Sequence, residues 1–169
     1  MINMQSITLI TDSPKETRRL GVHIGRLAQG NDIYLLTGKL GAGKTHLVQG
    51  IAFGLGVKEY ACSPSFMIAR EYQGRLALYH LDLYRLDHIG EIIDLGLDEY
   101  FKDDAVCAIE WAEKGSGLLP RHNLTIELEH LPGDRRKFTF VPLGARYIKL
   151  AAQLMDTLKK DNGEKWNFL

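Results

Sequence analysis

Short apolar runs alternate along this chain with stretches in which apolar residues recur three or four positions apart. Residues 6–11 and 33–37 are short apolar runs, which is typical of β-strands. Between them, Ser13 and Pro14 form a helix-start signal, with serine as the N-cap and proline at the first helical position. Apolar residues then follow at helical spacing until Gly30, which predicts the helix end. The chain therefore begins with a predicted strand–helix–strand unit.

The same alternation continues to the C-terminal end. Helices are predicted in three places, which are residues 44–56, 93–101 and 150–158. Strands are predicted in four, which are residues 76–83, 105–111, 124–130 and 137–141. The last two flank a Pro-Gly-Asp turn, which predicts an antiparallel hairpin near the C-terminal end. Strands that alternate with helices indicate an α/β fold with a largely parallel central sheet flanked by helices.

Length and composition limit the domain organisation and the class of protein. The 169 residues contain no repeat or linker, so we expect one domain over residues 1–160 and a polar, frayed tail over 161–169. Lys and Arg total 21, as do Asp and Glu, so the formal net charge is zero and gives no sign of broad attraction to nucleic acid or anionic lipid. No signal-peptide pattern or membrane-spanning apolar run is present, which predicts a cytoplasmic location and no membrane partner.

The most informative motif lies between a predicted strand and a predicted helix. Residues 38–45 read Gly-Lys-Leu-Gly-Ala-Gly-Lys-Thr and match the phosphate-binding pattern G-x-x-x-x-G-K-[ST] in full. Glycines let backbone N–H groups turn inward around phosphate, and the following helix presents its positive dipole end to the anion. Lys44 is expected to bridge the β- and γ-phosphates and Thr45 to bind magnesium. The sequence therefore predicts a P-loop NTPase-like fold that binds ATP and magnesium.

Hydrolysis also requires a carboxylate that anchors magnesium and a group that places the nucleophile. Glu110 ends a strongly apolar run, and Asp82 lies in a second one. We expect Lys44, Asp82 and Glu110 to be the catalytic residues. The sequence leaves open which of the two carboxylates lies closer to the metal.

Two polar segments have less certain roles on local pattern alone. Ser63-Pro64-Ser65 follows the P-loop helix and is equally compatible with a γ-phosphate-sensing switch and a plain loop. Arg135 follows the hairpin turn in a short basic run, which is more often a solvated face than part of a nucleotide site.

Several motifs occur in one order and together resemble a known family. They are the loop at 38–45, Ser63-Pro64-Ser65-Phe66, His80-Leu81-Asp82-Leu83-Tyr84-Arg85, Ile109-Glu110-Trp111 and Gly115-Ser116-Gly117-Leu118-Leu119-Pro120. Over residues 5–142 the chain resembles the bacterial ATPase component of the tRNA threonylcarbamoyladenosine system, the TsaE family, once called YjeE. One departure is Ser65, where the family usually has threonine. Serine keeps the hydroxyl group and loses the methyl group that stiffens threonine.

The resemblance implies a small cytoplasmic P-loop ATPase with weak turnover that partner proteins activate. The implied partners are the two subunits of the threonylcarbamoyl-transfer enzyme, of the TsaB and TsaD type, and tRNA is contacted mainly through that complex. It implies that Thr45 and Glu110 hold magnesium, that Asp82 supports hydrolysis, and that Pro14 lies by the adenine. The full set expected to bind the nucleotide is Pro14, Gly38, Leu40, Gly41, Ala42, Gly43, Lys44, Thr45, His46, Ser65 and Arg135.

Three other functions remain open from the sequence. A small-molecule P-loop kinase is the main alternative, although no clear arginine-bearing lid segment is present. A GTPase is a weaker alternative. Residues 87–90 fit D-x-x-G, but the sequence has no N-K-x-D stretch, the motif that recognises guanine. A nucleotide-gated binding module with negligible turnover is the third. Measuring ATP hydrolysis with and without partners separates that module from the ATPase.

Overall fold

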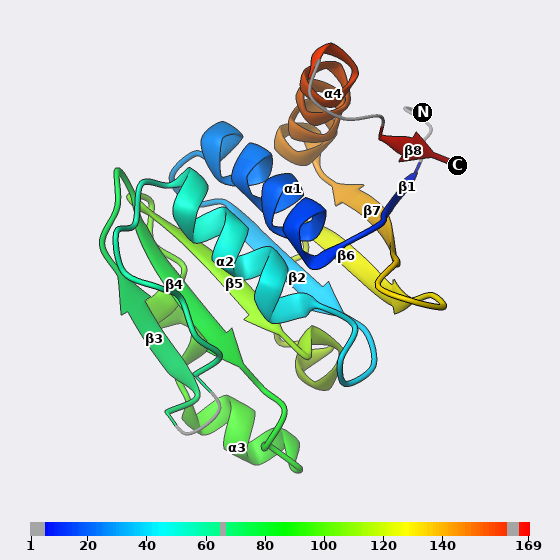
Figure 1. Ribbon diagram of the computed structural model, residues 1–169. Coiled ribbons are helices and arrows are strands. Elements are labelled where there is room, and N and C mark those ends of the chain that lie inside the picture. Colours follow the sequence, from blue (N-terminus) through cyan, green and yellow to red (C-terminus); the bar gives the residue numbers. More distant parts are fainter. Residues whose placement is uncertain (1–5, 65–66, 162–165) are drawn as a thin grey trace.

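The computed structural model describes residues 6–64, 67–161 and 166–169 and is built on one mixed sheet (Figure 1). The strand order is β3-β4-β5-β2-β6-β7-β1-β8. The strands are β1 (Ile7–Thr11), β2 (Ile33–Thr37), β3 (Ala69–Tyr72), β4 (Ala77–Asp82), β5 (Ala105–Glu110), β6 (Asn123–His130), β7 (Arg136–Leu143) and β8 (Asn167–Phe168). The helices are α1 (Pro14–Leu27), α2 (Lys44–Gly54), α3 (Ile89–Asp94) and α4 (Ala145–Lys160), with short 3-10 turns η1 (Leu97–Tyr100) and η2 (Ala112–Gly115).

The centre of the sheet is parallel and its outer strands are antiparallel. β4, β5, β2 and β6 pair in parallel, whereas β3, β7, β1 and β8 pair with their neighbours in antiparallel fashion. The predicted hairpin is formed by β6 and β7. The expected fold class is therefore confirmed: an α/β fold whose central sheet is mostly parallel.

Successive residues of the central strands pack on opposite faces of the sheet. In β2, Tyr34 and Leu36 join a core that includes residues of α1, α2 and α4, while Ile33 and Leu35 join a second core with residues of α3, η1 and η2. Because both faces are covered, the central strands are continuous apolar runs. α1 and α2 lie side by side across the first face (Figure 1).

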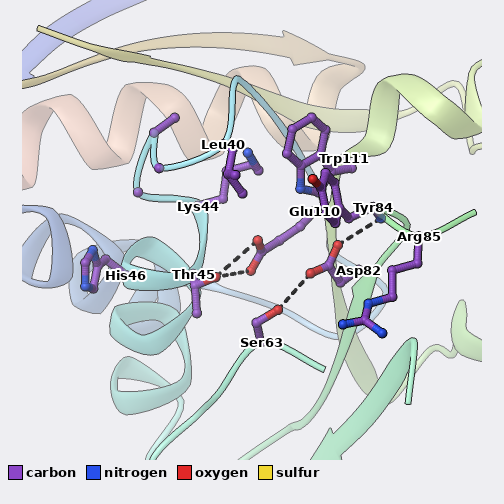
Figure 2. Close-up of a pocket in the computed structure, with 13 residues that line it drawn as sticks. Leu40, Lys44, Thr45, His46, Ser63, Asp82, Tyr84, Arg85, Glu110 and Trp111 are labelled. Atoms are coloured by element: carbon purple, nitrogen blue, oxygen red, sulfur yellow. Dashed lines mark hydrogen bonds between the residues drawn. The ribbon is translucent and has the colours of Figure 1, made fainter. Parts of the chain in front are cut away.

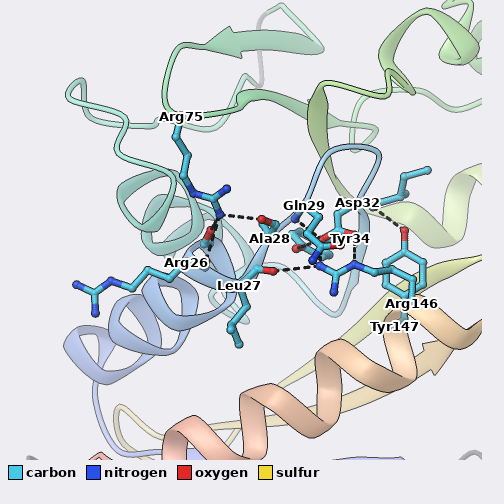
Figure 3. A network of polar contacts seen from close by, with 11 residues as sticks. Arg26, Leu27, Ala28, Gln29, Asp32, Tyr34, Arg75, Arg146 and Tyr147 are labelled. Carbon is cyan, nitrogen blue, oxygen red and sulfur yellow. Dashed lines mark hydrogen bonds and ion pairs between the residues drawn. The ribbon is translucent and has the colours of Figure 1, made fainter.

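The start of α1 matches its sequence signal. The Ser13 hydroxyl accepts a hydrogen bond from the Glu16 N–H at 3.2 Å, and Pro14 occupies the first helical position. The helix ends at Leu27 and not at Gly30, however. There the Arg75 guanidinium donates to the carbonyls of Gly25 and Ala28, which the sequence did not indicate (Figure 3).

Three elements differ from the sequence-based expectation. The helix predicted over 93–101, a prediction that Gly96 weakens, is interrupted at that glycine, which has a φ of 60°, so that α3 and η1 are separate. Strand β3 was not predicted, because its sequence Ala-Arg-Glu-Tyr is too polar to show a strand pattern. The tail was expected to be frayed unless Trp166 or Phe168 docked, and it includes β8, which pairs with β1 through Phe168 and Leu9.

An ion pair between buried Asp32 and partly buried Arg146 links the start of β2 to α4. Both Asp32 carboxylate oxygens accept from Arg146, at 2.8 and 2.6 Å, and one also accepts from the Tyr34 hydroxyl at 2.9 Å (Figure 3). The Tyr147 hydroxyl in turn accepts from the Ile33 N–H at 2.9 Å. These contacts fix α4 against β2, the strand that leads into the loop at 38–45.

Among the described residues, none of the helices has the length and apolar character needed to cross a bilayer.

Candidate functional site

The loop between β2 and α2 forms the floor of the candidate site. Gly43, which precedes α2, has a φ of 103°, in the left-handed region that favours glycine. The Leu47 N–H donates to the Gly43 carbonyl at 3.1 Å, so the helical hydrogen bonds begin there. N–H groups in the first turn of a helix have no acceptor within it and favour a bound anion. The loop therefore has the geometry of an anion-binding cup.

Lys44 reaches back across this cup. Its ammonium group donates to the carbonyls of Gly38 at 2.6 Å and Lys39 at 3.1 Å, and it lies 4.0 Å from the ring centroid of Trp111. Burial lowers the pKa of Lys44, and nearby carboxylates, Glu110 foremost, oppose that effect. Neutral carbonyl groups are weaker acceptors for an ammonium group than a phosphate is. A phosphate would therefore be a stronger partner for the Lys44 ammonium group than these two carbonyls are.

The end of β5 places Glu110 against the first turn of α2. The Thr45 hydroxyl donates to the two Glu110 carboxylate oxygens at 2.9 and 3.2 Å. Fully buried His80, on β4, has its Nε2 2.8 Å from the Glu110 Oε1. Two side chains from different elements thus fix the orientation of this carboxylate.

Asp82 lies beside Glu110 because the two are Cα partners in the parallel β4–β5 pair. The Asp82 carboxylate accepts from the Ser63 hydroxyl at 2.7 Å and from the Tyr84 N–H at 3.0 Å. Ser63 belongs to the segment that the sequence offered either as a switch or as a plain loop. Its hydrogen bond joins that segment to a carboxylate of the site.

These side chains converge on one pocket of about 360 Å³ (Figure 2). It lies at the carboxyl ends of β2, β4 and β5, where open α/β sheets bind their ligands. Seven residues of the expected nucleotide-binding set line it, together with the two expected catalytic carboxylates: Leu40, Gly41, Ala42, Gly43, Lys44, Thr45 and His46, with Asp82 and Glu110. Ser63, Tyr84, Arg85 and Trp111 complete the lining.

Comparison with known proteins decides the family. The model of the family described as "Threonylcarbamoyl adenosine biosynthesis protein TsaE" matches residues 11–138. The chain belongs to the TsaE family.

Relatives of this TsaE-family chain cover most of its length. It is 40% identical over 152 residues to the "tRNA threonylcarbamoyladenosine biosynthesis protein TsaE" of Bacillus subtilis, covering 89% of this chain and 95% of the relative. It is 40% identical over 130 residues to the protein of the same name from Treponema pallidum, covering 77% and 96%. The crystal structure of Bacillus subtilis YdiB superposes with a TM-score of 0.80 at 36% identity, over 90% of this chain and 96% of that one.

Not every residue of the expected set reaches the pocket in the TsaE-family chain. Gly38 is not part of the lining, although its carbonyl group accepts a hydrogen bond from Lys44. Pro14 begins α1 outside the lining, three residues after Thr11. Ser65 lies outside the described residues.

Arg135 is exposed at the hairpin turn, where its Nε donates to the Pro132 carbonyl at 3.4 Å. The next residue, Arg136, lies over the loop instead, since a Cβ built on Gly43 would be 3.5 Å from its Nε. The register explains the difference, because Arg136 is the Cα partner of Thr11 at the start of β7. Both arginines lie in the same short basic run, so the local sequence did not separate them, and the contact of Arg135 with a nucleotide stays a prediction.

His46 is a further member of the expected set that lines the pocket. Burial lowers the pKa of His46, and the positive charges of Arg18 and Arg136 lower it further. The imidazole is therefore mainly neutral near pH 7, so it adds hydrogen-bonding capacity to the pocket rather than charge.

The donors in the pocket fit magnesium held together with a phosphate. Among residues 6–64, 67–161 and 166–169, no group of three or more His, Cys, Asp or Glu side chains is arranged to hold a metal by itself. The Thr45 hydroxyl and the Glu110 carboxylate are oxygen donors already in contact. Magnesium usually takes one or two carboxylates, substrate phosphates and water in place of an all-protein cage. The donor set therefore suits a magnesium ion that arrives with a nucleotide.

Proposed function

We propose that this chain is a magnesium-dependent ATPase that acts with partner proteins in the threonylcarbamoyladenosine modification of tRNA. The modification role follows from the family and from the names of the relatives. The single observation that carries the ATPase proposal is the contact of Thr45 with Glu110 directly beside the P-loop lysine. In a P-loop enzyme, this is the pair that receives the metal of a bound nucleoside triphosphate.

Each residue has a distinct task in the proposed reaction. Backbone N–H groups of the loop and the Lys44 ammonium bind the phosphates and balance their charge. Thr45 and Glu110 would hold magnesium, which withdraws charge from the phosphate oxygens when bound. Asp82 accepts a hydrogen bond from the attacking water and orients it. Ser63, which donates to Asp82, links that carboxylate to the segment after α2.

The orientation of Asp82 depends on hydrogen bonds that a partner protein could alter. The Asp82 carboxylate accepts from the Ser63 hydroxyl and from the Tyr84 N–H. A carboxylate has about four acceptor sites, so Asp82 can still accept from a water, and these two contacts set the direction in which its remaining sites point. Partner proteins of the TsaB and TsaD type would adjust that direction and so the rate of turnover, and tRNA would be met mainly through their complex.

The Asp82→Asn variant tests this assignment. Asparagine keeps the shape of the side chain but loses the negative charge that attracts a water proton, so we expect normal Mg-ATP affinity and a hydrolysis rate at least about 100-fold lower. Calorimetry gives the affinity, and phosphate release with and without the two partner subunits gives the rate. Turnover at the wild-type rate would remove Asp82 from the reaction. Phosphoryl transfer to a metabolite faster than to water would favour a kinase.

A further inference from the structure

A second concave surface lies away from the ATP pocket, between α1, α2 and the segment that follows α2. This groove encloses about 410 Å³. Its lining is Arg18, Arg19, Val22, Gln49, Gly50, Phe53, Val57, Lys58, Glu59, Tyr60 and Ala61. The ATP pocket shares none of these residues. We define these residues as the α1–α2 groove.

The close packing of the two helices explains why the groove exists. A Cβ on Gly21 would lie 2.3 Å from the Leu47 carbonyl oxygen, and one on Gly50 would lie 2.0 Å from the Arg18 carbonyl oxygen. The backbones touch along this line, so larger side chains are displaced to its flank. Phe53, one helical turn beyond Gly50, stands on that flank and is 69% exposed.

Two aromatic rings face solvent within this one groove. Tyr60, on the segment after α2, is 65% exposed and lines the same groove as Phe53. Single exposed apolar residues are ordinary on protein surfaces, whereas an apolar groove that carries two exposed aromatic side chains is typical of an interaction site. Burying such rings against a partner removes apolar surface from water.

The groove is also basic. Arg18, Arg19 and Lys58 line it, against one carboxylate, that of Glu59. Glu59 is paired with Arg70 at 3.5 Å and Arg19 with Asp161 at 2.6 Å, so the positive charge offered to an occupant comes mainly from Arg18 and Lys58. An occupant with complementary chemistry therefore carries carboxylates around an apolar centre.

The segment that lines the groove leads directly into the ATP pocket. From Tyr60 the chain continues to Cys62, whose N–H donates to the hydroxyl of buried Tyr72 at 3.0 Å. The next residue, Ser63, donates to the Asp82 carboxylate. A contact at Tyr60 is thus three residues from a hydrogen bond that holds the proposed water-orienting group.

We propose that the α1–α2 groove is the docking site for a partner protein that presents an apolar side chain flanked by acidic residues. The occupant acts on Ser63 through the segment 58–62 and so sets the rate of ATP hydrolysis. This inference rests on the proposed function, in which the partners are the subunits of the threonylcarbamoyl-transfer enzyme. It adds the surface that meets them and the route by which they reach the ATP pocket.

Binding of the purified transfer-enzyme subunits to the full chain tests the proposal. We expect Phe53→Ser and Tyr60→Ser each to lower the affinity at least about tenfold, as removal of a central aromatic contact does. Lys58→Glu should weaken binding and reduce its dependence on salt concentration. Basal hydrolysis and Mg-ATP affinity should stay at wild-type values in all three, while stimulation by the partners is lost. Ile93→Ser is the matched control, because Ile93 is 58% exposed on α3 and lies outside the groove.

The possible results separate the groove from the proposed function. If the wild-type chain binds the subunits and the groove variants bind equally well, the groove assignment is wrong and the function stands. If the wild-type chain binds neither subunit, both fail. Loss of tRNA binding with subunit binding intact would overturn the proposal in favour of a nucleic-acid site. If the groove variants bind the subunits normally but no longer self-associate, as measured by light scattering, the proposal is overturned and the groove binds a second copy of the chain.

Discussion

At the residue scale, the candidate site depends on a few side chains whose partners are themselves held in place. Lys44 is held by two loop carbonyls and an indole ring, and Glu110 by a threonine and a histidine. Such prearranged groups lose little freedom when they bind a ligand. Single substitutions here should therefore change ligand binding more than they change stability.

Lys44→Ala should lower the affinity for Mg-ATP by about 10- to 100-fold, because a charge-assisted hydrogen bond to phosphate is lost. Calorimetry with ATP and magnesium measures the effect. Burial lowers the pKa of Lys44, so the folded state gains little from its charge and thermal stability should remain close to wild type. Unchanged ATP affinity in a folded variant would disprove the role of the loop.

Glu110→Gln should make ATP binding much less dependent on magnesium. The amide keeps the size of the carboxylate but is a poorer ligand for a hard cation, so the apparent magnesium affinity should fall about tenfold or more. Titration of magnesium at fixed ATP measures this, and ATP binding in the presence of a chelator is the control that should not change. A magnesium dependence equal to that of the wild type would exclude Glu110 as a ligand.

At the scale of elements, the close contact of α1 with α2 supports both the P-loop and the α1–α2 groove. Glycines on the two helices, Gly21 and Gly50, let backbone meet backbone, and a Cβ on either would lie under 3 Å from carbonyl or Cα atoms. α1 begins at Pro14, three residues after the end of β1, and α2 begins at Lys44, within the loop at 38–45. Their spacing therefore determines where Arg18 and His46 lie with respect to one another.

Gly50→Ala should destabilise the fold by about 2 kcal/mol, because overpacking against rigid backbone costs up to about 3 kcal/mol and better helix propensity returns about 1 kcal/mol. The upper end of the cost applies because the added Cβ would lie 2.0 Å from a carbonyl oxygen. The matched control is Gly90→Ala on α3, where a Cβ would meet no atom within 4 Å and which should be neutral or slightly stabilising. Urea unfolding measures both variants. Equal stabilities would show that α1 and α2 separate at little cost.

At the scale of the whole molecule, the buried network around Asp32 joins β2, α1 and α4. Burial and the neighbouring Asp32 carboxylate raise the pKa of Tyr34 well above its ordinary value. The tyrosine in the unfolded chain ionises near pH 10, whereas the one in the folded chain keeps its proton. This contribution to stability is therefore complete below about pH 10 and declines as the pH rises above it.

The free energy of unfolding should accordingly fall above pH 10, with Tyr34 contributing up to about 1.4 kcal/mol per pH unit. Tyr34→Phe keeps the ring in the core and removes the ionisable group, so its stability should decline less steeply over the same range. Urea unfolding between pH 8 and pH 11 measures both slopes. Parallel curves for the two proteins would show that Tyr34 does not carry the effect.

Much of the fold and of the site could be predicted from the sequence, because their signals are local. The loop at 38–45, the capped start of α1 and the carboxylates that end β4 and β5 are written in consecutive residues and were found. Strands β3 and β8 were not, because their placement depends on pairing with distant residues. The break at Gly96 is a local effect, since the glycine takes the left-handed conformation that ends a helix.

The sequence by itself determined that a glycine loop with the phosphate-binding pattern follows a buried strand, since glycine geometry and helix capping act within a few residues. Only the tertiary structure decided which side chains surround that loop. The pairing of β1 with β7 brings Arg136 to the loop in place of Arg135, and the pairing of β4 with β5 sets Asp82 beside Glu110. Strand register has a period of two, so one residue of shift changes which side chain faces the site, and contacts across the sheet fix that register.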